Sequence, residues 1–258
     1  MSDITTHYTD NIAIITLNRH EKHNAFNDTM LLSLQDAFNK AAVSEDIRAI
    51  LLTAEGRHFS AGADLEWMQR QIGASENENK ADALILANTL YTLHSCPKPT
   101  IAVVQGLAMG GAVGLIAASD IAIAATDARF CFSEVKLGLI PAVISPYVVN
   151  AIGARTATWL FMSAEMIDSA TALRLNLIHH CVEGDHLKNF ALNYAKNLNS
   201  LAPEAIKMCK QLVKMVDKQP IDEILIDKTA QLIAEKRVSL EGQKGLHAFL
   251  TKSTPEWN

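Results

Sequence analysis

Cysteine is scarce in this 258-residue sequence, and its spacing argues against the usual cysteine-based frameworks. No two cysteines form a C-x-x-C pair, so neither a zinc site nor a disulfide framework is expected. We expect reduced, mostly buried thiols. The histidines are scattered, and none has a cysteine or an acid at metal-ligand spacing, so no metal site is predicted. The cysteines are Cys96, Cys131, Cys181 and Cys209.

The sequence also lacks sorting signals. The opening residues, MSDITTHYTDN, contain neither the basic start and apolar run of a secretion signal nor the arginines of a transit peptide. A cytoplasmic location is therefore expected. No charged residue occurs between Lys98 and Asp120, but this stretch contains Gln105 and four glycines. It predicts a buried strand, a glycine turn and a short helix instead of a membrane span.

Several common nucleotide-binding and catalytic motifs are missing. No G-x-G-x-x-G follows a predicted strand, and G-K-[ST], G-x-S-x-G and H-E-x-x-H do not occur. Their absence argues against a dinucleotide fingerprint, a P-loop, a serine-hydrolase elbow and a zinc-protease site. The net charge is −5, which argues against a generally basic surface for nucleic acid.

The sequence does contain enough apolar residues, 49%, for a large core. Residue patterning predicts mixed strands and helices before Gly153 and helices after it. Residues 56–80 are predicted to form a polar connection. The predicted strands are 4–8, 12–17, 48–53, 101–105 and 121–125, and the early helices are 29–43, 80–94 and 111–118. The later helices are 154–163, 168–175, 185–199, 203–218, 221–237 and 241–251.

This pattern predicts an α/β fold with two parts. Residues 1–195 are expected to form the α/β core, and residues 196–258 a helical C-terminal region. The late helices carry more apolar surface than a monomer needs. Packing of these helices against other copies of the chain is therefore expected.

Two glycine-bearing segments stand out as candidates for a site. Phe59–Leu65 follows one predicted strand, and Gln105–Ala112 follows another. Small residues let the backbone approach a ligand closely, and the second segment opens a helix whose N–H groups are free. One N–H group from each segment would make an oxyanion hole for a carbonyl that becomes an enolate. Two tight turns in a packed domain would produce the same pattern without any site.

Three motifs, taken in order and spacing, give the sequence a resemblance to a known family. FSAGADL, GLAMGGAVGL and FSEVKLGLIP resemble the crotonase (enoyl-CoA hydratase/isomerase) superfamily. The resemblance runs from Leu17-Asn18-Arg19 to Ala248-Phe249-Leu250. It implies a spiral of ββα units followed by helices that build a homotrimer, often paired into a homohexamer. It also implies an acyl-CoA substrate, with coenzyme A as part of the substrate and no separate cofactor, and no membrane partner.

The resemblance implies roles for individual residues. Ala63 and Gly111 match the two oxyanion N–H donors. Phe249 and Lys252 match an adenine wall and a phosphate contact near the C-terminus. The remaining implied substrate contacts are Lys22 and His23 near the CoA phosphates, then Ala25, Ala61, Asp64, Leu65, Glu66, Gly110 and Gly114.

The catalytic carboxylates depart from the pattern of typical hydratases in the family. These enzymes have two glutamates, and Glu134 matches the second. Gly114 occupies the place of the first, so only Glu134 is left for acid–base work. We expect a water molecule, or part of a carboxylated or branched acyl group, to use the space beside Gly114.

A single glutamate at the second position leaves two activities open. It is typical of Δ3,Δ2-enoyl-CoA isomerases, in which one base moves a proton between two carbons. Longer segments of the sequence, including FCFSEVKLGLIPAVISPYVV, resemble bacterial methylglutaconyl-CoA and carboxygeranoyl-CoA hydratases of leucine and terpenoid breakdown. The sequence therefore favours a hydratase of the methylglutaconyl-CoA type, with the isomerase as the alternative.

A row of lysines raises a different class of function, RNA binding. Some relatives of methylglutaconyl-CoA hydratase bind RNA through a lysine-bearing helix. Lys207, Lys210, Lys214 and Lys218 recur here at helical spacing. An amphipathic surface helix gives the same row, and the net charge is negative, so RNA binding is not the favoured interpretation.

Overall fold

A six-stranded sheet forms the centre of the fold in the computed structural model, which describes residues 2–257. Its strand order is β1-β2-β3-β4-β6-β9. The first two strands pair antiparallel, and every later pair is parallel. Parallel strands are covered on both faces, which explains their nearly continuous apolar runs. The strands are β1 (Ile4–Thr9), β2 (Ile12–Leu17), β3 (Ala49–Ala54), β4 (Thr100–Val104), β6 (Ile121–Ala125) and β9 (His180–Val182).

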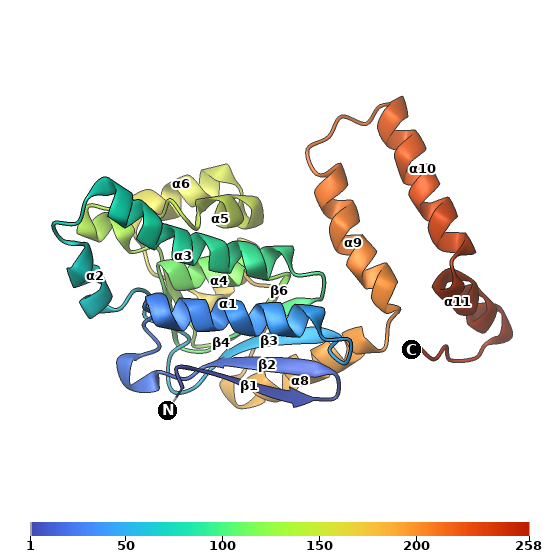
Figure 1. Cartoon of the computed structure of the whole chain (residues 1–258), viewed down its shortest axis with the longest axis horizontal. Helices are drawn as coiled ribbons and strands as arrows, with labels where there is room; N and C mark the ends of the chain where they lie inside the picture. The colour runs from blue at the N-terminus through green and yellow to red at the C-terminus, as the bar shows by residue number, and fades with distance from the viewer. Residues whose placement is uncertain (1, 258) are drawn as a thin grey trace. The chain divides into compact units, whose positions relative to one another are not determined.

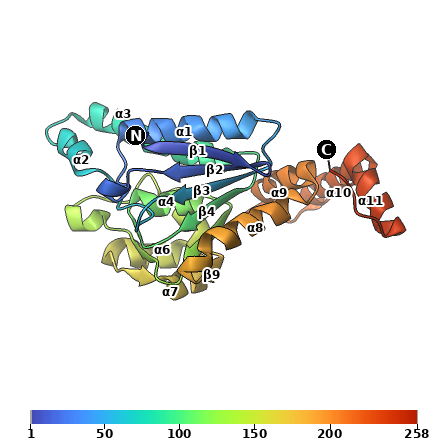
Figure 2. The same cartoon turned by 90° about the horizontal axis from the view of Figure 1, so that it is seen from below.

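Helices cover this sheet, and a second sheet of three short strands completes the α/β unit. Figures 1 and 2 show α1 and α3 side by side along one face, where the two helices contact each other. The helices are α1 (Asp28–Val43), α2 (Leu65–Gln71), α3 (Glu76–Ser95), α4 (Gly111–Ala118), α5 (Ser145–Ile152), α6 (Ala154–Ser163), α7 (Ser169–Arg174) and α8 (Leu187–Asn199). The short strands are β5 (Leu107–Met109), β7 (Arg129–Cys131) and β8 (Ile167–Asp168).

The chain divides into two compact units, Met1–Lys196 and Asn197–Asn258. The second unit contains α9 (Pro203–Val216), α10 (Glu223–Val238) and α11 (Leu240–Thr251). The division falls one residue beyond the boundary expected at 195/196. The predicted α/β fold with a helical C-terminal region is confirmed. Over residues 2–257, no helix combines the length and the hydropathy needed to cross a membrane.

The connection predicted at 56–80 is wrong in part, because it contains helices. Asp64 caps α2 by accepting from the Glu66 and Trp67 N–H groups. A capping box between Ser75 and Glu78 starts α3 at Glu76, four residues before the predicted start. The other elements that the sequence did not predict include the strands β5, β7, β8 and β9, which have two or three residues each and so carry no periodic signal.

Asn24 ties the turn after β2 to the segment after β3. Its side chain is fully buried, and its Nδ2 donates to the carbonyl oxygens of Glu55 and His58 at 2.8 and 2.9 Å. Its Oδ1 accepts from the Arg19 N–H at 2.9 Å. Its backbone carbonyl accepts the Ser60 hydroxyl at 2.7 Å. Because Asn24 is fully buried, its own polar groups need these protein partners.

We predict that Asn24→Ala destabilises the fold by about 2–4 kcal/mol, because it leaves two carbonyls and one N–H without their partner. Asn11→Ala is the matched control. Asn11 also has a left-handed φ, 60° against 53° for Asn24, but its side chain makes one exposed hydrogen bond to Asp46. The control should cost about 1 kcal/mol. Urea unfolding measures both, and equal losses would contradict the role of the Asn24 network.

Candidate active site

A cleft of about 480 Å³ in the α/β unit brings together the predicted oxyanion donors and the predicted acid. Its wall is mostly apolar, with a few polar side chains, as is usual for small-molecule sites. The residues that line it are Phe26, Ala63, Trp67, Gln71, Asn79, Asp82, Ala83, Leu86, Gly111, Glu134, Gly138, Leu139, Ile140, Pro141, Ala142, Val143 and Ile144.

Ser60 holds the two glycine-bearing segments together. Its N–H donates to the Leu107 carbonyl, and its own carbonyl accepts from the Met109 N–H, both at 3.1 Å. Its hydroxyl accepts from the Gly62 N–H at 3.1 Å while donating to Asn24. The backbone after β3 and the backbone before α4 are therefore paired like adjacent strands.

The N–H of Ala63 points away from the adjacent segment that contains Phe26. Phe26 donates to the Gly62 carbonyl at 2.8 Å and accepts from the Asp64 N–H at 3.0 Å. In this parallel bridge the carbonyl of Gly62 and the N–H of Asp64 point toward Phe26. The N–H of Ala63, between them, therefore points away from Phe26. Within residues 2–257, the Ala63 N–H has no hydrogen-bond acceptor.

Gly111 supplies the second donor because it is the first residue of α4. The first N–H groups of a helix have no acceptor within the helix. The neighbouring N–H of Gly110 is already used by the Cys131 carbonyl at 2.9 Å, whereas the part of the chain that is described offers no acceptor to Gly111. Ala63 and Gly111 both line the cleft, so it contains two N–H groups for a carbonyl oxygen.

The close approach of these segments requires glycine. Gly62 and Gly110 have left-handed φ values of 93° and 53°. A Cβ on Gly62 would lie 3.0 Å from the Met109 carbonyl oxygen. A Cβ on Gly111 would lie 3.0 Å from a ring carbon of Phe26. Small residues here permit the backbone contact that sets the two donors in place.

Glu134 is a half-buried residue in the same cleft, and one of its carboxylate oxygens is fully buried. It begins the 3₁₀ turn Glu134–Leu137, and its Oε2 is buried with no hydrogen-bond partner among the described residues. Its Oε1 lies close to Gly110, since a Cβ on that glycine would be 3.3 Å away. Burial raises the pKa of Glu134 above the ordinary 4.5, although its own backbone N–H opposes the shift. These are the properties of a general base kept ready for a ligand.

The structure contradicts the expectation for Gly114. A Cβ on Gly114 would lie 2.3 Å from Cγ2 of Ile144 and 3.5 Å from Cδ1 of Leu90. The space beside this glycine is therefore filled by the Ile144 side chain, and neither a water nor an acyl group fits between them. Gly114 itself is buried in α4 and is not among the residues lining the cleft.

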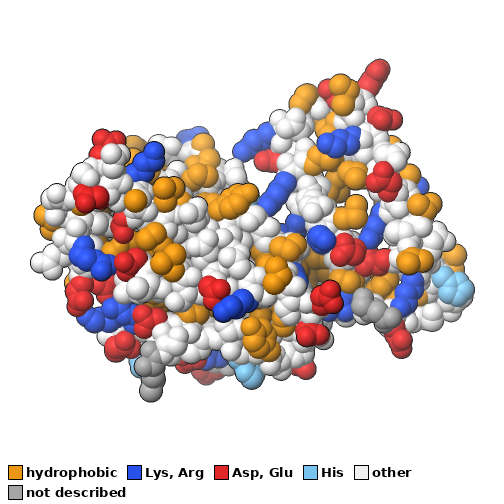
Figure 3. Space-filling view, viewed as in Figure 1, with side chains coloured by type: hydrophobic (Ala, Val, Ile, Leu, Met, Phe, Trp, Pro, Cys, Tyr) orange, Lys and Arg blue, Asp and Glu red, His pale blue; other side chains and the backbone are white. Residues whose placement is uncertain are grey.

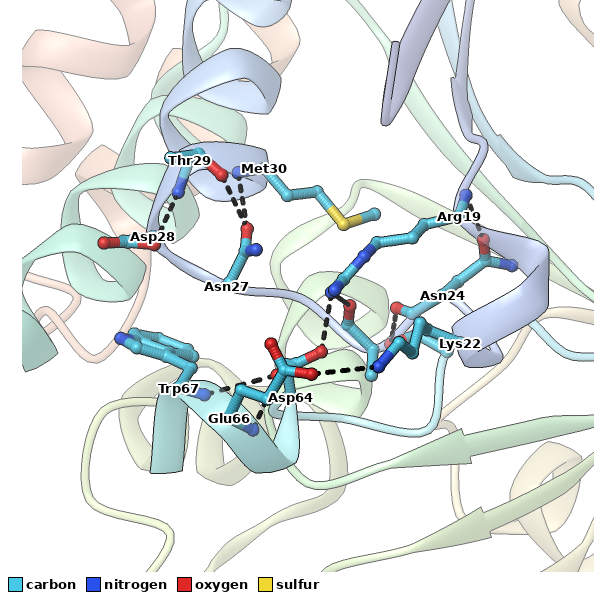
Figure 4. Close-up of polar contacts among 12 residues, drawn as sticks. Arg19, Lys22, Asn24, Asn27, Asp28, Thr29, Met30, Asp64, Glu66 and Trp67 are labelled. Carbon is cyan, nitrogen blue, oxygen red and sulfur yellow. Dashed lines mark hydrogen bonds and ion pairs between the residues drawn. The ribbon is translucent and has the colours of Figure 1, made fainter. Parts of the chain in front are cut away.

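The Asp64 carboxylate is bound by protein groups and does not line the cleft. It caps α2 and forms an ion pair with Arg19 at 2.8 Å (Figure 4). Burial opposes its ionisation, but the N–H groups of Trp67 and Glu66 and the Arg19 guanidinium outweigh burial and lower its pKa. The loop Ala63–Glu66 is therefore fixed by its own acid.

The predicted CoA contacts of the first unit lie around this loop. Lys22 and Glu66 form an exposed ion pair at 3.2 Å (Figure 4). Leu65 is 82% exposed beside them. The His23 carbonyl accepts from the Ala61 N–H at 2.9 Å, and the buried Ala25 carbonyl accepts from Arg19 at 2.9 Å. The backbones of Ala25 and Ala61 are thus structural, while Lys22, Leu65 and Glu66 are open to a ligand.

Residues predicted near the C-terminus belong to the second unit. Phe249 in α11 is 81% exposed, and Lys252 ends that helix with a left-handed φ of 55°. Their contacts with CoA remain predictions. In the lysine row, Lys207 pairs with Glu204 at 3.5 Å, and Lys218 pairs with Asp217 at 3.8 Å.

A polar cluster on the cleft wall was missed from the sequence. The Asp82 carboxylate of α3 accepts from Trp67 Nε1 at 2.7 Å and from Gln71 Nε2 at 2.6 Å. These bonds hold α2 against α3 beside the cleft. The i, i+4 spacing of Trp67 and Gln71 was the available signal. Over residues 2–257, no three His, Cys, Asp or Glu side chains are grouped to hold a metal ion.

Comparison with known proteins identifies the family. The family model described as enoyl-CoA hydratase/isomerase matches residues 7–258. A structure from Legionella pneumophila assigned as an enoyl-CoA hydratase/isomerase (crotonase) is 54% identical, covers all of both chains and has a TM-score of 0.97. An enoyl-CoA hydratase from Shewanella pealeana is 43% identical over 99% of this chain and 96% of its own, with a TM-score of 0.95.

A curated relative agrees with these structures. The 2,3-dehydroadipyl-CoA hydratase of Escherichia coli is 27% identical over 100% of this chain and 99% of its own. The match extends over the free N–H groups of Ala63 and Gly111 and over Glu134, so the site and the comparisons point the same way. The chain belongs to the enoyl-CoA hydratase/isomerase family, the crotonase superfamily.

Proposed function

We propose that this protein is an enoyl-CoA hydratase that adds water across the α,β double bond of an acyl-CoA thioester with Glu134 as its only acid–base group. One observation carries the proposal. The Glu134 carboxylate lies in the cleft that also holds the free N–H groups of Ala63 and Gly111. Its Oε2 is buried without a hydrogen-bond partner among the described residues, and burial raises its pKa.

The proposed reaction uses each of these groups. The thioester carbonyl oxygen accepts from the Ala63 and Gly111 N–H groups, which stabilise negative charge on it. Glu134 takes a proton from water as the water oxygen bonds to Cβ, and the double-bond electrons move to form the enolate. The enolate then collapses as Glu134 returns the proton to Cα. The proton is therefore conserved between the two steps, and no cofactor besides the CoA of the substrate is required.

Isomerisation of a Δ3-enoyl-CoA to its Δ2 isomer is the second candidate. One base is enough for this reaction, because it removes a proton from one carbon and returns it to another. The filling of the space beside Gly114 by Ile144 favours this candidate, since no second acid is present there. Turnover of crotonyl-CoA and of a 3-enoyl-CoA, compared as kcat/KM, distinguishes the two activities.

The sequence resemblance adds a finer hypothesis, a methylglutaconyl-CoA type substrate from leucine breakdown in the cytoplasm. This hypothesis requires a preference for a carboxylated acyl group. The lining of the cleft favours the opposite preference, because its charged side chains are the carboxylates of Glu134 and Asp82. The RNA-binding side role has no specific observation in its favour, since Lys207 and Lys218 pair with acids in their own unit.

The predicted homotrimer or homohexamer is supported by an apolar groove of about 560 Å³ in the second unit. Hydrophobic side chains gather over α9 and α10 in Figure 3. The groove is lined by Ala205, Met208, Cys209, Gln211, Leu212, Met215, Val216, Thr229, Leu232, Ile233 and Lys236. We expect a solution mass of three or six times 28.2 kDa, measured by light scattering. A mass of one chain at micromolar concentration would contradict this proposal.

We predict that Glu134→Gln lowers kcat by about 10²–10⁴-fold while acyl-CoA binding is retained, because glutamine keeps the shape but cannot take a proton. Stopped-flow or steady-state hydration of the best 2-enoyl-CoA measures the loss. Glu45→Gln, an exposed acid exchanged in the same way, is the control. A loss below tenfold would remove Glu134 from the mechanism.

The pH profile gives an independent check of the same assignment. Glu134 must be ionised to act as a base, so activity falls as the pH drops through its pKa. Because burial raises that pKa, the acid limb of kcat/KM should lie above the ordinary 4.5. An acid limb at or below that value would contradict the assignment.

A pair of variants at Gly111 tests the backbone donor. Gly111→Ala and Gly111→Pro both place a Cβ near Phe26 and Leu86, but only proline removes the N–H. We predict that Gly111→Pro is about 10²–10³-fold slower in kcat than Gly111→Ala, which is the typical cost of one oxyanion donor. Equal activities of two folded variants would show that the Gly111 N–H is not used.

A further inference from the structure

Ile144 fills the space beside Gly114, the position that the sequence resemblance matches to the first glutamate of typical hydratases. It immediately precedes α5, and its Cγ2 and Cβ would lie 2.3 and 2.8 Å from a Cβ on Gly114. Its side chain is 2% exposed, yet it lines the cleft. The glycine on α4 and the isoleucine before α5 thus fit together as a notch and the side chain that fills it.

The position of Ile144 along α4 places it beside the acyl chain. Gly111, the oxyanion donor, lies three residues before Gly114, which is roughly 4.5 Å along a helix axis. That distance is the reach of a few methylene groups. An acyl chain whose carbonyl is held at Gly111 and which runs along this wall of the cleft passes Ile144.

The wall that continues from Ile144 is apolar. Leu86, Leu139, Ile140 and Val143 line the cleft with it. The charged side chains among the lining residues are the two carboxylates Glu134 and Asp82. A carboxylate on the acyl group would lose its water against this wall and would face charges of its own sign.

We propose that Ile144 is the acyl-specificity residue of this site, and that its apolar side chain over Gly114 selects uncharged acyl groups against those carrying a distal carboxylate. The inference rests on the proposed function for the nature of the ligand, an acyl-CoA thioester. It opposes the methylglutaconyl-CoA hypothesis, which needs a carboxylated acyl group.

Binding of a matched pair of saturated thioesters tests the charge preference without turnover. Adipyl-CoA is hexanoyl-CoA with its terminal methyl replaced by a carboxylate, so the pair differs at one position of the chain. In calorimetric titration of the wild-type protein at neutral pH, we expect adipyl-CoA to bind at least tenfold more weakly than hexanoyl-CoA. Equal or tighter binding of adipyl-CoA would overturn the proposal.

Substitution of Ile144 tests the residue. Ile144→Ala opens the space over Gly114 and removes apolar surface from the wall, so the affinity for adipyl-CoA relative to hexanoyl-CoA should rise at least fivefold. Ile144→Val should shift the ratio in the same direction by less, and it carries the test if the alanine variant does not fold. Ile72→Ala is the control, because Ile72 is 82% exposed and is not among the residues that line the cleft, so its ratio should not move.

The outcomes separate this inference from the proposed function. Selective binding without hydration of any 2-enoyl-CoA overturns the hydratase and leaves the specificity role intact. Hydration without the expected charge preference, or an unchanged affinity ratio in both Ile144 variants, overturns the specificity role alone. Failure of the wild-type protein to bind any acyl-CoA overturns both.

Discussion

The hydrogen bonds of Ser60 are the constraint on which the site depends. This buried residue pairs with Leu107 and Met109 through its backbone, and its hydroxyl joins Asn24 to Gly62. Ala63 lies three residues after Ser60, and Gly111 lies two residues after Met109. Both N–H donors are thereby fixed before any ligand arrives, so no free energy is spent on arranging them during a reaction.

Glu134, the candidate base, lowers the stability of the folded protein. Burial raises the pKa of Glu134, so the folded state binds its proton more tightly than the unfolded chain does. The stability of the fold therefore decreases as the pH rises through the pKa of this residue. A buried carboxylate oxygen without a hydrogen-bond partner among the described residues is tolerated at this position because the same environment suits proton transfer, a common exchange of stability for activity.

The sequence predicted the long, strongly patterned elements and the residues of the three motifs. The strands at 12–17 and 48–53 and the helix at 29–43 were found within a residue of their predicted bounds, because each has a clear apolar period. Glu134, Ala63 and Gly111 were placed by resemblance, and the structure brings all three to one cleft.

Contacts between distant segments could not be predicted from the sequence. The resemblance implied that Asp64 contacts the substrate. Instead, its carboxylate forms an ion pair with Arg19, 45 positions away, which stabilises the fold. Likewise, nothing local reveals that Ile144 fills the space over Gly114, since that contact joins α4 to the residue before α5. Such pairs arise only from tertiary packing, which a local pattern does not encode.

The fit of Ile144 over Gly114 also fixes an order in which this site can change. A side chain gained first at position 114 would enter the core against Ile144, and overpacking of this kind destabilises a fold. A smaller residue gained first at position 144 leaves a folded protein that still has one acid. One-acid and two-acid forms of the site are therefore joined by a route of at least two steps. That route begins at position 144, although the chemical difference lies at position 114.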